Sequence, residues 1–550
     1  MLLLSTSIKN FDQLYKAGIE AEANREYLLA LSNYSSALTL TTSTNQALLW
    51  HKIGMVYLQI EKYYQAFENL SFALTLNPKN TETMHGLAVA NFFLGNFEDS
   101  CKYIDEACKL VPNNHIYAID RASIRSVYNP DPHYKFTLYR EWGRRFADPL
   151  EIKNRPFNYD PSPDRKLRIG YVSGDMRDHA VAFFMEPVFA NHDKNKVEVH
   201  IYSNSQVNDA VTARLKKLVP YWHDVTKITD EALYELIRSH KIDVLVDLSG
   251  HTKGQRLFVF ARRAAPVQVT WLGYMGGTLG MQAMDYRITD FGTDPVGKEE
   301  FYVETLFRMR CMACYQPPAD CEITPLPPML SSGTPTLISL NGSRKITDEM
   351  LLLWGKILEQ RKDAQLFIQV QENSDEDCIA TMEPRLRKAN LPLDRVILSP
   401  HVPLQEFMKR GSIADVALDT HPVSGGTTTL HTLWMGLPIV TFRGHDSVSS
   451  TTSATLTEFG LEKWVADNDD EYIQHVLALL NNLETLIEHR KNIRNMMQNS
   501  LLMNYKEQYQ ELEGLYQRMW LNYLLGEKRF VTSLAPCEDV IGLLKNNAHK

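Results

Sequence analysis

The chain has 550 residues, of which 44% are hydrophobic and 23% are charged, so it is long enough for two to four globular domains. The net charge of −8 argues against nucleic acid as the main partner, because no basic excess is available for phosphate contacts. No apolar run approaches the roughly 18 residues that a membrane span needs, and Met1–Leu4 is too short for a signal peptide. Seven scattered cysteines favour a reducing compartment, so we expect a cytoplasmic protein.

Two of the cysteines are spaced closely enough to suggest a metal site. Cys311 and Cys314 are separated by two residues, and Cys321 lies nearby. A structural zinc ion needs four ligands at characteristic spacing, and the sequence offers no fourth ligand close to these three. We therefore expect structural thiols here and predict no metal site.

Residues 11–113 contain an internal repeat with a period of 34 residues. The repeated positions are mostly apolar or small and end in a proline: Trp50, Ile53, Gly54, Tyr57, Ala66, Leu70, Ala73 and Pro78, then Met84, Leu87, Ala88, Asn91, Ser100, Ile104, Ala107 and Pro112. A looser copy precedes them. The pattern resembles the tetratricopeptide repeat, whose helix pairs stack into a superhelix with a concave face. We interpret that face as a groove for protein segments; a spacer or a homodimerisation arm would have the same pattern.

Residues 114–163 form a connector, with helical stretches and a proline- and aspartate-rich end that marks a domain boundary. Strand-like and helical stretches alternate after it, which predicts a parallel sheet with helices on both faces. The strand-like stretches are 167–173, 197–203, 242–250, 267–274 and 284–290, and 230–240 is a helix.

Polar or glycine-rich loops follow three of these strands. Asp175 and His179 follow the first strand, residues 250–254 follow another, and residues 273–278 follow a third. Ligands bind at the carboxyl ends of the strands in such sheets, so these loops indicate one cleft. Plain turns, which glycine also favours, are the alternative.

The alternation of strands and helices restarts near Pro335. Strands are expected at 336–342, 364–370 and 395–400, and helices at 347–360 and 404–412. Lys345 lies between the first strand and the first helix of this half. Lys345 would lie near an anion bound at residues 425–429 if the strands before the two loops are neighbours in the sheet. The alternative is that Lys345 is a solvated surface lysine.

Residues 415–441 form a strand–helix–strand unit in this second half. An apolar run, 416–418, reads as a buried strand, and the spacing of Leu430, Leu433 and Trp434 predicts a helix. This helix opens on two glycines and three threonines, residues 425–429. Unpaired N–H groups and the helix dipole make such an opening an anion site, and glycine lets a phosphate approach the backbone. An ordinary capped helix has a similar composition.

Taken together, these motifs resemble the O-linked N-acetylglucosamine transferase family, including its SPINDLY-type protein O-fucosyltransferases. The resemblance runs from the repeats to residue 525, and its motifs are 167–181, 250–256, 265–274, 340–346, 410–420 and 425–441. It implies a tetratricopeptide-repeat superhelix followed by a GT-B pair of Rossmann-like domains, an α plus α/β fold. The expected limits are 1–113 for the repeats, 114–163 for the connector, 164–328 and 329–525 for the two catalytic domains, and 526–550 for a tail.

The resemblance implies a nucleotide-sugar site in the second catalytic domain. Its residues would be Lys345, Phe407, Arg410, Gly425, Gly426, Thr427, Thr428 and His431. Lys345 and the helix opening would bind the donor diphosphate and stabilise the leaving nucleotide, an electrostatic form of transition-state stabilisation. Arg410 would contact the base, Phe407 would stack on it, and His431 would face the ribose. We expect nucleotide binding to depend on pH, because an ordinary histidine becomes charged below about pH 6.5.

The resemblance places the sugar and the acceptor beside the first catalytic domain. Lining residues would be Thr252, Gly273, Tyr274 and Thr278, and His179 is the candidate catalytic base. Such an enzyme is an inverting protein O-glycosyltransferase, and Lys345 with the helix would replace a metal ion, so no metal or other cofactor is expected. The repeats would recruit the protein acceptors.

Several residues depart from the family pattern. Gly426 replaces the histidine of some members, His431 stands where an acidic residue normally faces the ribose, and Ser450 stands where many members have arginine. UDP-N-acetylglucosamine is the best candidate donor, with GDP-fucose or UDP-glucose as alternatives. The alternative to an enzyme is a binding protein that has the repeats but whose catalytic half no longer works.

Overall fold

The computed structural model describes residues 10–41, 43–319 and 321–526. It divides into two compact units, and each is described by itself. One contains residues 1–125, 341–359 and 366–403, and the other contains 126–340, 360–365 and 404–550. Residues 1–4 and the expected polar tail after residue 526 lie outside the described ranges.

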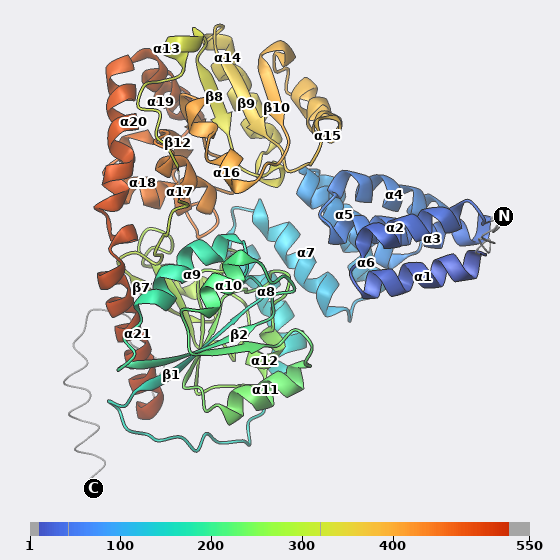
Figure 1. Cartoon of the computed structure of the whole chain (residues 1–550), viewed down its shortest axis with the longest axis vertical. Helices are drawn as coiled ribbons and strands as arrows, with labels where there is room; N and C mark the ends of the chain where they lie inside the picture. The colour runs from blue at the N-terminus through green and yellow to red at the C-terminus, as the bar shows by residue number, and fades with distance from the viewer. Residues whose placement is uncertain (1–9, 42, 320, 527–550) are drawn as a thin grey trace, which may run out of the picture. The chain divides into compact units, whose positions relative to one another are not determined.

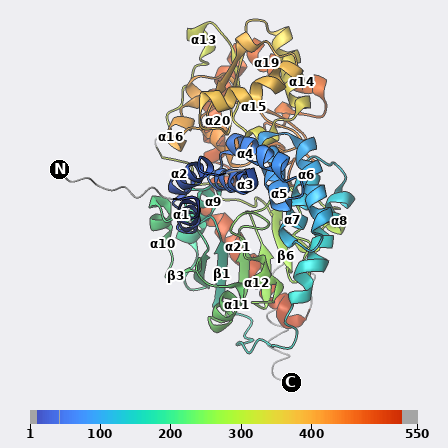
Figure 2. The same cartoon turned by 90° about the vertical axis from the view of Figure 1, so that its right-hand side faces the viewer.

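The first unit holds the helical repeats (Figures 1 and 2). Helices pack in consecutive pairs, and they are α1 (Phe11–Ala23), α2 (Tyr27–Leu38), α3 (Ser43–Gln59), α4 (Tyr63–Leu76), α5 (Thr81–Leu94) and α6 (Phe97–Leu110). Tyr117 and Ile124 of the next helix, α7 (His115–Val127), join the core of the third pair. The predicted helical repeats are confirmed: three helix pairs correspond to the looser copy and the two clear copies of the repeat.

Close helix packing in the repeats depends on glycine. A Cβ atom at Gly54 would lie 2.5 Å from Leu70 Cγ, and one at Gly18 would lie 2.4 Å from the ring of Tyr34. Both partner side chains are buried. Small residues at these positions therefore let the two helices of each pair approach each other.

The same unit includes part of the second sheet and its helices. These elements are α14 (Asp348–Gln360), β9 (Gln365–Gln369), α15 (Asp375–Lys388) and β10 (Val396–Ser399). Gln65 of α4 donates to Asp377 of α15 at 2.7 Å, and the Arg344 guanidinium lies 5.6 Å from the ring centroid of Phe93 in α5. The repeats therefore pack directly against this part of the second sheet region.

The second unit contains a seven-stranded sheet in the order β3-β2-β1-β4-β5-β6-β7, and its pairings are parallel. The strands are β1 (Leu167–Ser173), β2 (Val197–Ser203), β3 (Tyr221–Asp224), β4 (Val244–Asp247), β5 (Val267–Thr270), β6 (Tyr286–Asp290) and β7 (Thr305–Met309). The sequence reading missed β3 and β7. Helices of this region are α8 (Pro132–Trp142), α9 (Ala180–Asn191), α10 (Ala210–Lys216), α11 (Asp230–Ser239) and α12 (Leu257–Ala261).

The second sheet has the order β10-β9-β8-β11-β12-β13. Its remaining strands are β8 (Thr336–Ser339), β11 (Val416–Leu418), β12 (Ile439–Phe442) and β13 (Val465–Ala466). The helices after them are α17 (Thr427–Trp434), α18 (Thr451–Glu458), α19 (Asp469–Asn481) and α20 (Leu483–Gln498). Two parallel Rossmann-like sheets after helical repeats confirm the predicted fold class.

Two expectations about helices are corrected. The helix expected over 404–412 is the short α16 (Leu404–Phe407), followed by a separate 3-10 turn, Arg410–Ser412. At the C-terminal end the sequence predicts a helix only from about residue 521, whereas α21 (Tyr505–Leu525) begins sixteen residues earlier. Leu512, Tyr516 and Trp520 of α21 belong to the core of the first sheet, beside which the helix runs in both views (Figures 1 and 2).

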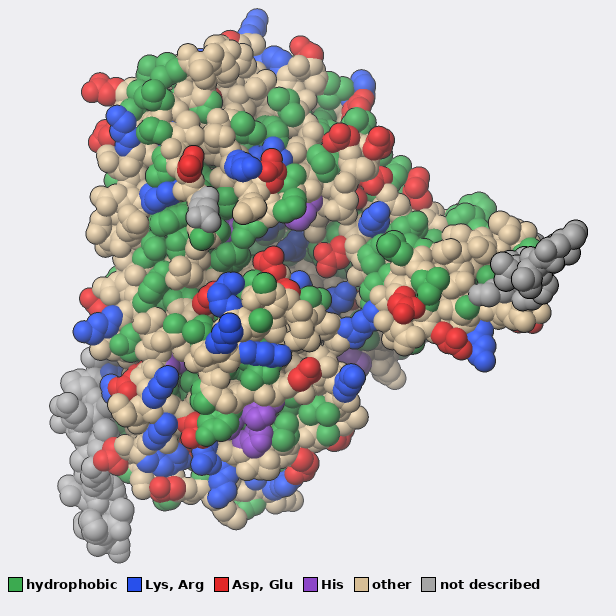
Figure 3. All heavy atoms as spheres, in the orientation of Figure 1, with side chains coloured by type: hydrophobic (Ala, Val, Ile, Leu, Met, Phe, Trp, Pro, Cys, Tyr) green, Lys and Arg blue, Asp and Glu red, His purple; other side chains and the backbone are tan. Residues whose placement is uncertain are grey.

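No helix in the part of the chain that the structure describes is long and apolar enough to cross a membrane. Acidic and basic side chains are interspersed on the face shown in Figure 3, with no extended basic surface there.

The glycine contacts in the repeats predict a stability effect. Gly54→Ala should lower the free energy of unfolding by about 1–3 kcal/mol, because the new methyl group overlaps Leu70 in a packed core. Gly514→Ala in α21 is the matched control, since a Cβ atom there meets nothing within 4 Å. Thermal unfolding followed by circular dichroism should show a lower midpoint for the first variant alone. Equal midpoints for wild type and Gly54→Ala would contradict the packing argument.

Candidate functional site

The opening of α17 combines a glycine cap with accessible threonines. Gly426 is the N-cap residue of the helix and no side chain caps its first turn. A Cβ atom at Gly426 would meet nothing within 4 Å, so the space beside this residue is open. Gly426, Thr427 and Thr428 are partly exposed. The first N–H groups of a helix lack intrahelical partners, so this opening can bind an anion.

A buried carboxylate fixes the loop in front of α17. Asp419, at the end of β11, accepts the N–H of Gly425 at 2.8 Å and the hydroxyl of Thr441 at 2.7 Å. Thr441 lies on the neighbouring strand β12. The Thr452 hydroxyl also donates to the Gly425 carbonyl at 3.2 Å. These bonds hold the two glycines in place before the helix begins.

The predicted base-binding residues lie on a turn held by a buried arginine. Phe407 ends α16, and Arg410 begins the following 3-10 turn. Arg490 of α20 is fully buried, and its guanidinium donates to the carbonyl groups of Gly411 at 2.6 Å and Ala414 at 2.9 Å. Burial lowers the pKa of Arg490 to about 10. Its positioning role had no signal in the sequence, because it occupies an ordinary position of an amphipathic helix.

His431 is enclosed by aromatic side chains. Its Nδ1 atom is hydrogen bonded to the Tyr315 hydroxyl at 2.7 Å, and its ring meets that of Phe183 edge to face at a centroid distance of 4.8 Å. The Phe407 ring lies 6.0 Å away. Burial lowers the pKa of His431 to about 4. The expected charging just below pH 6.5 is therefore wrong, because the imidazole stays neutral until the pH approaches about 4.

The contact between Phe183 and His431 brings α9 and α17 together. Phe183 lies one turn after His179, which is the N-cap residue of α9. The N–H of Val181 donates to His179 Nδ1 at 3.3 Å, so the proton of the neutral ring resides on Nε2. Nε2 lies 3.8 Å from a carboxylate oxygen of Asp175, whose pKa is raised by burial. Nε2 of His179 is therefore a hydrogen-bond donor. His179 can act as a base only after its Nδ1 atom has released the N–H of Val181.

The loop after β4 repeats the arrangement seen after β11. Asp247 accepts the N–H groups of Ser249 and Gly250, both at 3.1 Å or less, and the hydroxyl of Thr270 on the neighbouring strand β5 at 2.9 Å. Burial raises the pKa of Asp247 to about 6. Thr252, predicted to line the site, donates to the Ser249 carbonyl at 2.8 Å. Its hydroxyl therefore closes the turn.

His251 in this loop was not singled out from the sequence. Its Nε2 atom is 3.0 Å from the Leu279 carbonyl oxygen, to which it donates. Its Nδ1 atom is buried without a hydrogen-bond partner. Burial lowers the pKa of His251 to about 4, so it is neutral near pH 7. A neutral imidazole with an acceptor nitrogen among Tyr139, Trp142 and Tyr274 is a second candidate functional histidine.

The residues predicted at 273–278 have mixed surroundings. A Cβ atom at Gly273 would lie 1.8 Å from the Leu248 carbonyl oxygen, so glycine is required by packing. Tyr274 is partly exposed and donates to the Tyr139 hydroxyl. Thr278 is buried and donates to Glu304 at 2.6 Å. Gly273 and Thr278 therefore build the loop, whereas Tyr274 has a ring edge that can meet a ligand.

Lys345 lies in the other compact unit. It ends the 3-10 turn Ser343–Lys345, six residues after β8, and its N–H donates to the Gly342 carbonyl at 2.8 Å. The pairing of β8 with β11 is parallel, as the expected position of Lys345 requires. Its proximity to a bound diphosphate stays a prediction.

The cysteines expected to be structural are free thiols. Cys314 belongs to the core of the first sheet. Burial raises the pKa of both Cys311 and Cys314 to about 12, so neither is a thiolate near pH 7. These environments fit the interpretation as structural thiols.

Comparison with known proteins identifies the family. Residues 150–313 and 335–512 match the glycosyl transferase family 41. Proteins named "Probable UDP-N-acetylglucosamine--peptide N-acetylglucosaminyltransferase SPINDLY" from Solanum lycopersicum and Arabidopsis thaliana are 34% identical over 71% of this chain. The chain spans 42% and 43% of their lengths. A solved lysine-to-methionine mutant of the O-GlcNAc transferase from Thermobaculum terrenum is 34% identical, with a TM-score of 0.87 over 94% of this chain and 98% of that chain.

The burial of His431 predicts an acid-dependent loss of stability. The unfolded chain takes up a proton near pH 6.5, whereas the folded chain does so near pH 4. The free energy of unfolding should therefore fall as the pH drops from about 6.5 to 4, by up to roughly 3 kcal/mol from this residue. Urea unfolding across this range should show a shallower fall for His431→Leu than for wild type.

Tyr315→Phe is the matched control for that measurement. It removes the same hydrogen bond but keeps the imidazole, so it should lower stability at pH 7 by about 1 kcal/mol and keep the pH dependence. If His431→Leu and wild type lose stability in parallel on acidification, the imidazole is not buried in its neutral form.

Proposed function

Because the chain belongs to glycosyl transferase family 41, we propose that it transfers N-acetylglucosamine from UDP-N-acetylglucosamine to serine or threonine hydroxyls of proteins. The observation that carries this proposal is the accessible opening of α17, which Asp419 holds in place. The ring contact between Phe183 and His431 joins α17 to α9, and His179 is the N-cap residue of α9. The names of the SPINDLY relatives support the donor and the acceptor class. A cytoplasmic location stays a prediction from the sequence.

The proposed reaction inverts the configuration at the sugar. The acceptor oxygen forms a bond to the anomeric carbon as the bond from that carbon to the diphosphate breaks. Negative charge grows on the leaving diphosphate, where the N–H groups of Gly426, Thr427 and Thr428 and the ammonium of Lys345 stabilise it. The hydroxyl proton passes to a phosphate oxygen or to His179 once the imidazole has released the Val181 N–H. Cations and dipoles of the protein replace a divalent ion in this scheme.

Two departures from the family pattern keep the alternatives open. Ser450 has a buried hydroxyl with no hydrogen-bond partner, and neutral His431 stands in place of an acidic residue. A protein O-fucosyltransferase, a protein glucosyltransferase or a catalytically impaired binding protein would fit these changes. Calorimetric titration with UDP and with GDP separates the nucleotides, and hydrolysis of the donor by the purified chain excludes an inactive protein.

Recruitment of acceptors by the repeats is part of the same proposal. Large hydrophobic side chains on the repeat helices are exposed, including Leu28 at 77% and Phe72 at 47%. Exposed apolar groups of this kind mark a surface for protein partners or for a second copy of the chain. Leu28→Asp should slow transfer to whole proteins without changing donor hydrolysis. If it changes the sedimentation coefficient instead, the surface is a homodimer interface.

The electrostatic role of Lys345 predicts a large loss of activity. Lys345→Ala should reduce the rate of sugar transfer on the order of 10²–10³-fold, because one preorganised charge at the leaving group is lost. Lys388→Ala is the matched control: this lysine is 75% exposed and pairs with Asp348. Both variants should have the circular dichroism spectrum of the wild type. A near-wild-type rate for Lys345→Ala in a radiolabelled-sugar assay would rule out the assigned role.

The same scheme predicts that transfer does not require a divalent ion. The initial rate should be unchanged after treatment with EDTA, because Lys345 and the α17 opening stabilise the diphosphate without a metal. The rate should be compared in EDTA alone, in EDTA followed by excess magnesium, and in EDTA followed by excess manganese. Activity lost in EDTA and restored by either ion would show that the mechanism is wrong.

A further inference from the structure

Three histidines lie close together on one face of the first sheet. His200 is on β2, His223 is on the neighbouring edge strand β3, and His240 is the C-cap residue of α11. In the register of the two strands, Tyr202 pairs with His223 and His200 pairs with Tyr221. Because side chains two residues apart share a face of a strand, the sheet itself places His200 and His223 on the same side. The sequence reading assigned no role to any of them.

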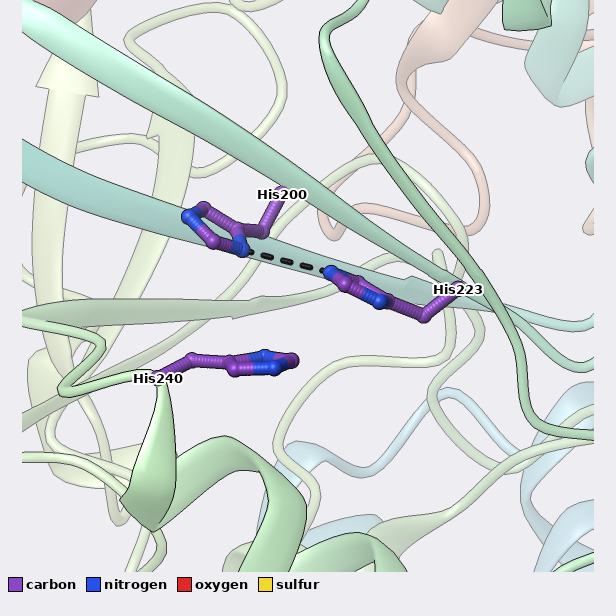
Figure 4. A group of neighbouring side chains, drawn as sticks. All are labelled: His200, His223 and His240. Carbon is purple, nitrogen blue, oxygen red and sulfur yellow. Dashed lines mark hydrogen bonds between the residues drawn. The ribbon is translucent and has the colours of Figure 1, made fainter.

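The three imidazoles offer ring nitrogens to a common point (Figure 4). One nitrogen from each residue lies within 4.8 Å of the other two. The distance between His200 Nδ1 and His223 Nε2 is 3.3 Å. Two imidazole nitrogens bound to a tetrahedral zinc ion at the usual bond length are ~3.4 Å apart. The distance between these two nitrogens matches one edge of the coordination tetrahedron, and the His240 nitrogen has to move closer to both to complete a face.

The other ring nitrogens are held by groups that orient metal ligands. His200 Nε2 is 3.1 Å from a carboxylate oxygen of Glu198, which leaves Nδ1 directed toward His223. His240 Nδ1 is 2.8 Å from the Tyr202 hydroxyl, which leaves its Nε2 for an ion. A carboxylate or hydroxyl on the far nitrogen of a ligating histidine fixes the ring and its tautomer.

We propose that His200, His223 and His240 bind one divalent transition-metal ion, with zinc as the physiological candidate and a water molecule as the fourth ligand. Three imidazoles suit zinc, cobalt, nickel and copper, whereas magnesium and calcium require oxygen ligands. His200 binds through Nδ1, and His223 and His240 bind through Nε2. The site is independent of the proposed sugar transfer and needs no step of that reaction.

The surrounding charges and exposure allow an ion to enter. Arg168 lies near the cluster, but its Nε atom is 3.1 Å from a carboxylate oxygen of Glu198, so its charge is balanced there. His223 and His240 are partly exposed, whereas His200 is 6% exposed. Histidine side chains also reach the surface of the first-sheet region in Figure 3. An ion can therefore reach the cluster from solvent while the deepest ligand stays fixed.

Metal binding at this position would join three elements at the edge of the first sheet. β3 is a four-residue edge strand paired with β2 alone. Short edge strands have few contacts and open readily. An ion held by β2, β3 and the end of α11 would therefore link these elements, and zinc would raise the thermal midpoint by an amount that grows with the logarithm of its free concentration.

Cobalt titration of the untagged full chain tests this proposal directly. After EDTA treatment and removal of the chelator, Co²⁺ should produce the visible d–d absorption of a tetrahedral complex at one equivalent, and Zn²⁺ should abolish it. Calorimetry with Zn²⁺ should give one site, and a hundredfold excess over the dissociation constant should raise the thermal midpoint by roughly 5 °C. Mg²⁺ should have no effect.

Variants locate the ion. His223→Gln and His240→Gln should each weaken Zn²⁺ binding at least tenfold, whereas His401→Gln, which changes an exposed histidine outside the cluster, should bind as wild type does. Circular dichroism checks that each variant is folded. Two cluster variants are used so that the test still stands if one of them fails to fold. Wild-type protein without a cobalt spectrum, or cluster variants that bind Zn²⁺ like wild type, would overturn the proposal and leave a stacked aromatic cluster.

EDTA should lower the thermal midpoint but not the transfer rate, so failure of this proposal is distinguishable from failure of the transferase proposal.

Discussion

The candidate site depends on buried carboxylates at the ends of two sheet strands. Asp419 directly follows β11 and Asp247 ends β4, and each accepts one or more backbone N–H groups of the loop that follows. Each also accepts a threonine hydroxyl from the next strand of its sheet, Thr441 or Thr270. A buried carboxylate is stable only when its oxygens accept several hydrogen bonds. The two sheets therefore use the same pattern of hydrogen bonds to fix the glycine-containing loops that follow these strands.

This arrangement separates rigid support from accessible chemistry. Arg490 holds the turn that carries Arg410, and Tyr315 holds the ring of His431, while the start of α17 stays open. Backbone dipoles fixed in this way need no reorganisation as charge develops on a leaving diphosphate. Burial also keeps His431 and His251 neutral near pH 7, so these imidazoles act as hydrogen-bonding groups there. These two histidines thus contribute polarity and shape near pH 7 without adding charge.

Periodicity in the sequence was enough to predict the repeats, most strands of both sheets and the glycine opening of α17, because each depends on local pattern. The strands β3 and β7 were missed since their residues lack a continuous apolar run, and β13 was missed because it has only two residues. Helix α21 reaches the first sheet only through tertiary packing. Arg490, Tyr315 and the three clustered histidines were also missed, because their partners are distant in sequence. Thr252 and Thr278 were correctly placed in loops, but the sequence could not show that their hydroxyls are used within the protein.

The most direct test of the central claim is the intact mass of an acceptor protein after incubation with the purified chain and UDP-N-acetylglucosamine. The acceptor should gain one or more N-acetylhexosamine units, which are released by alkaline treatment as expected for serine and threonine linkages. A parallel incubation with GDP-fucose should leave the mass unchanged. Addition of a deoxyhexose from GDP-fucose would contradict the proposed donor. If neither donor adds a sugar and the chain binds neither UDP nor GDP, the proposed transferase function is wrong.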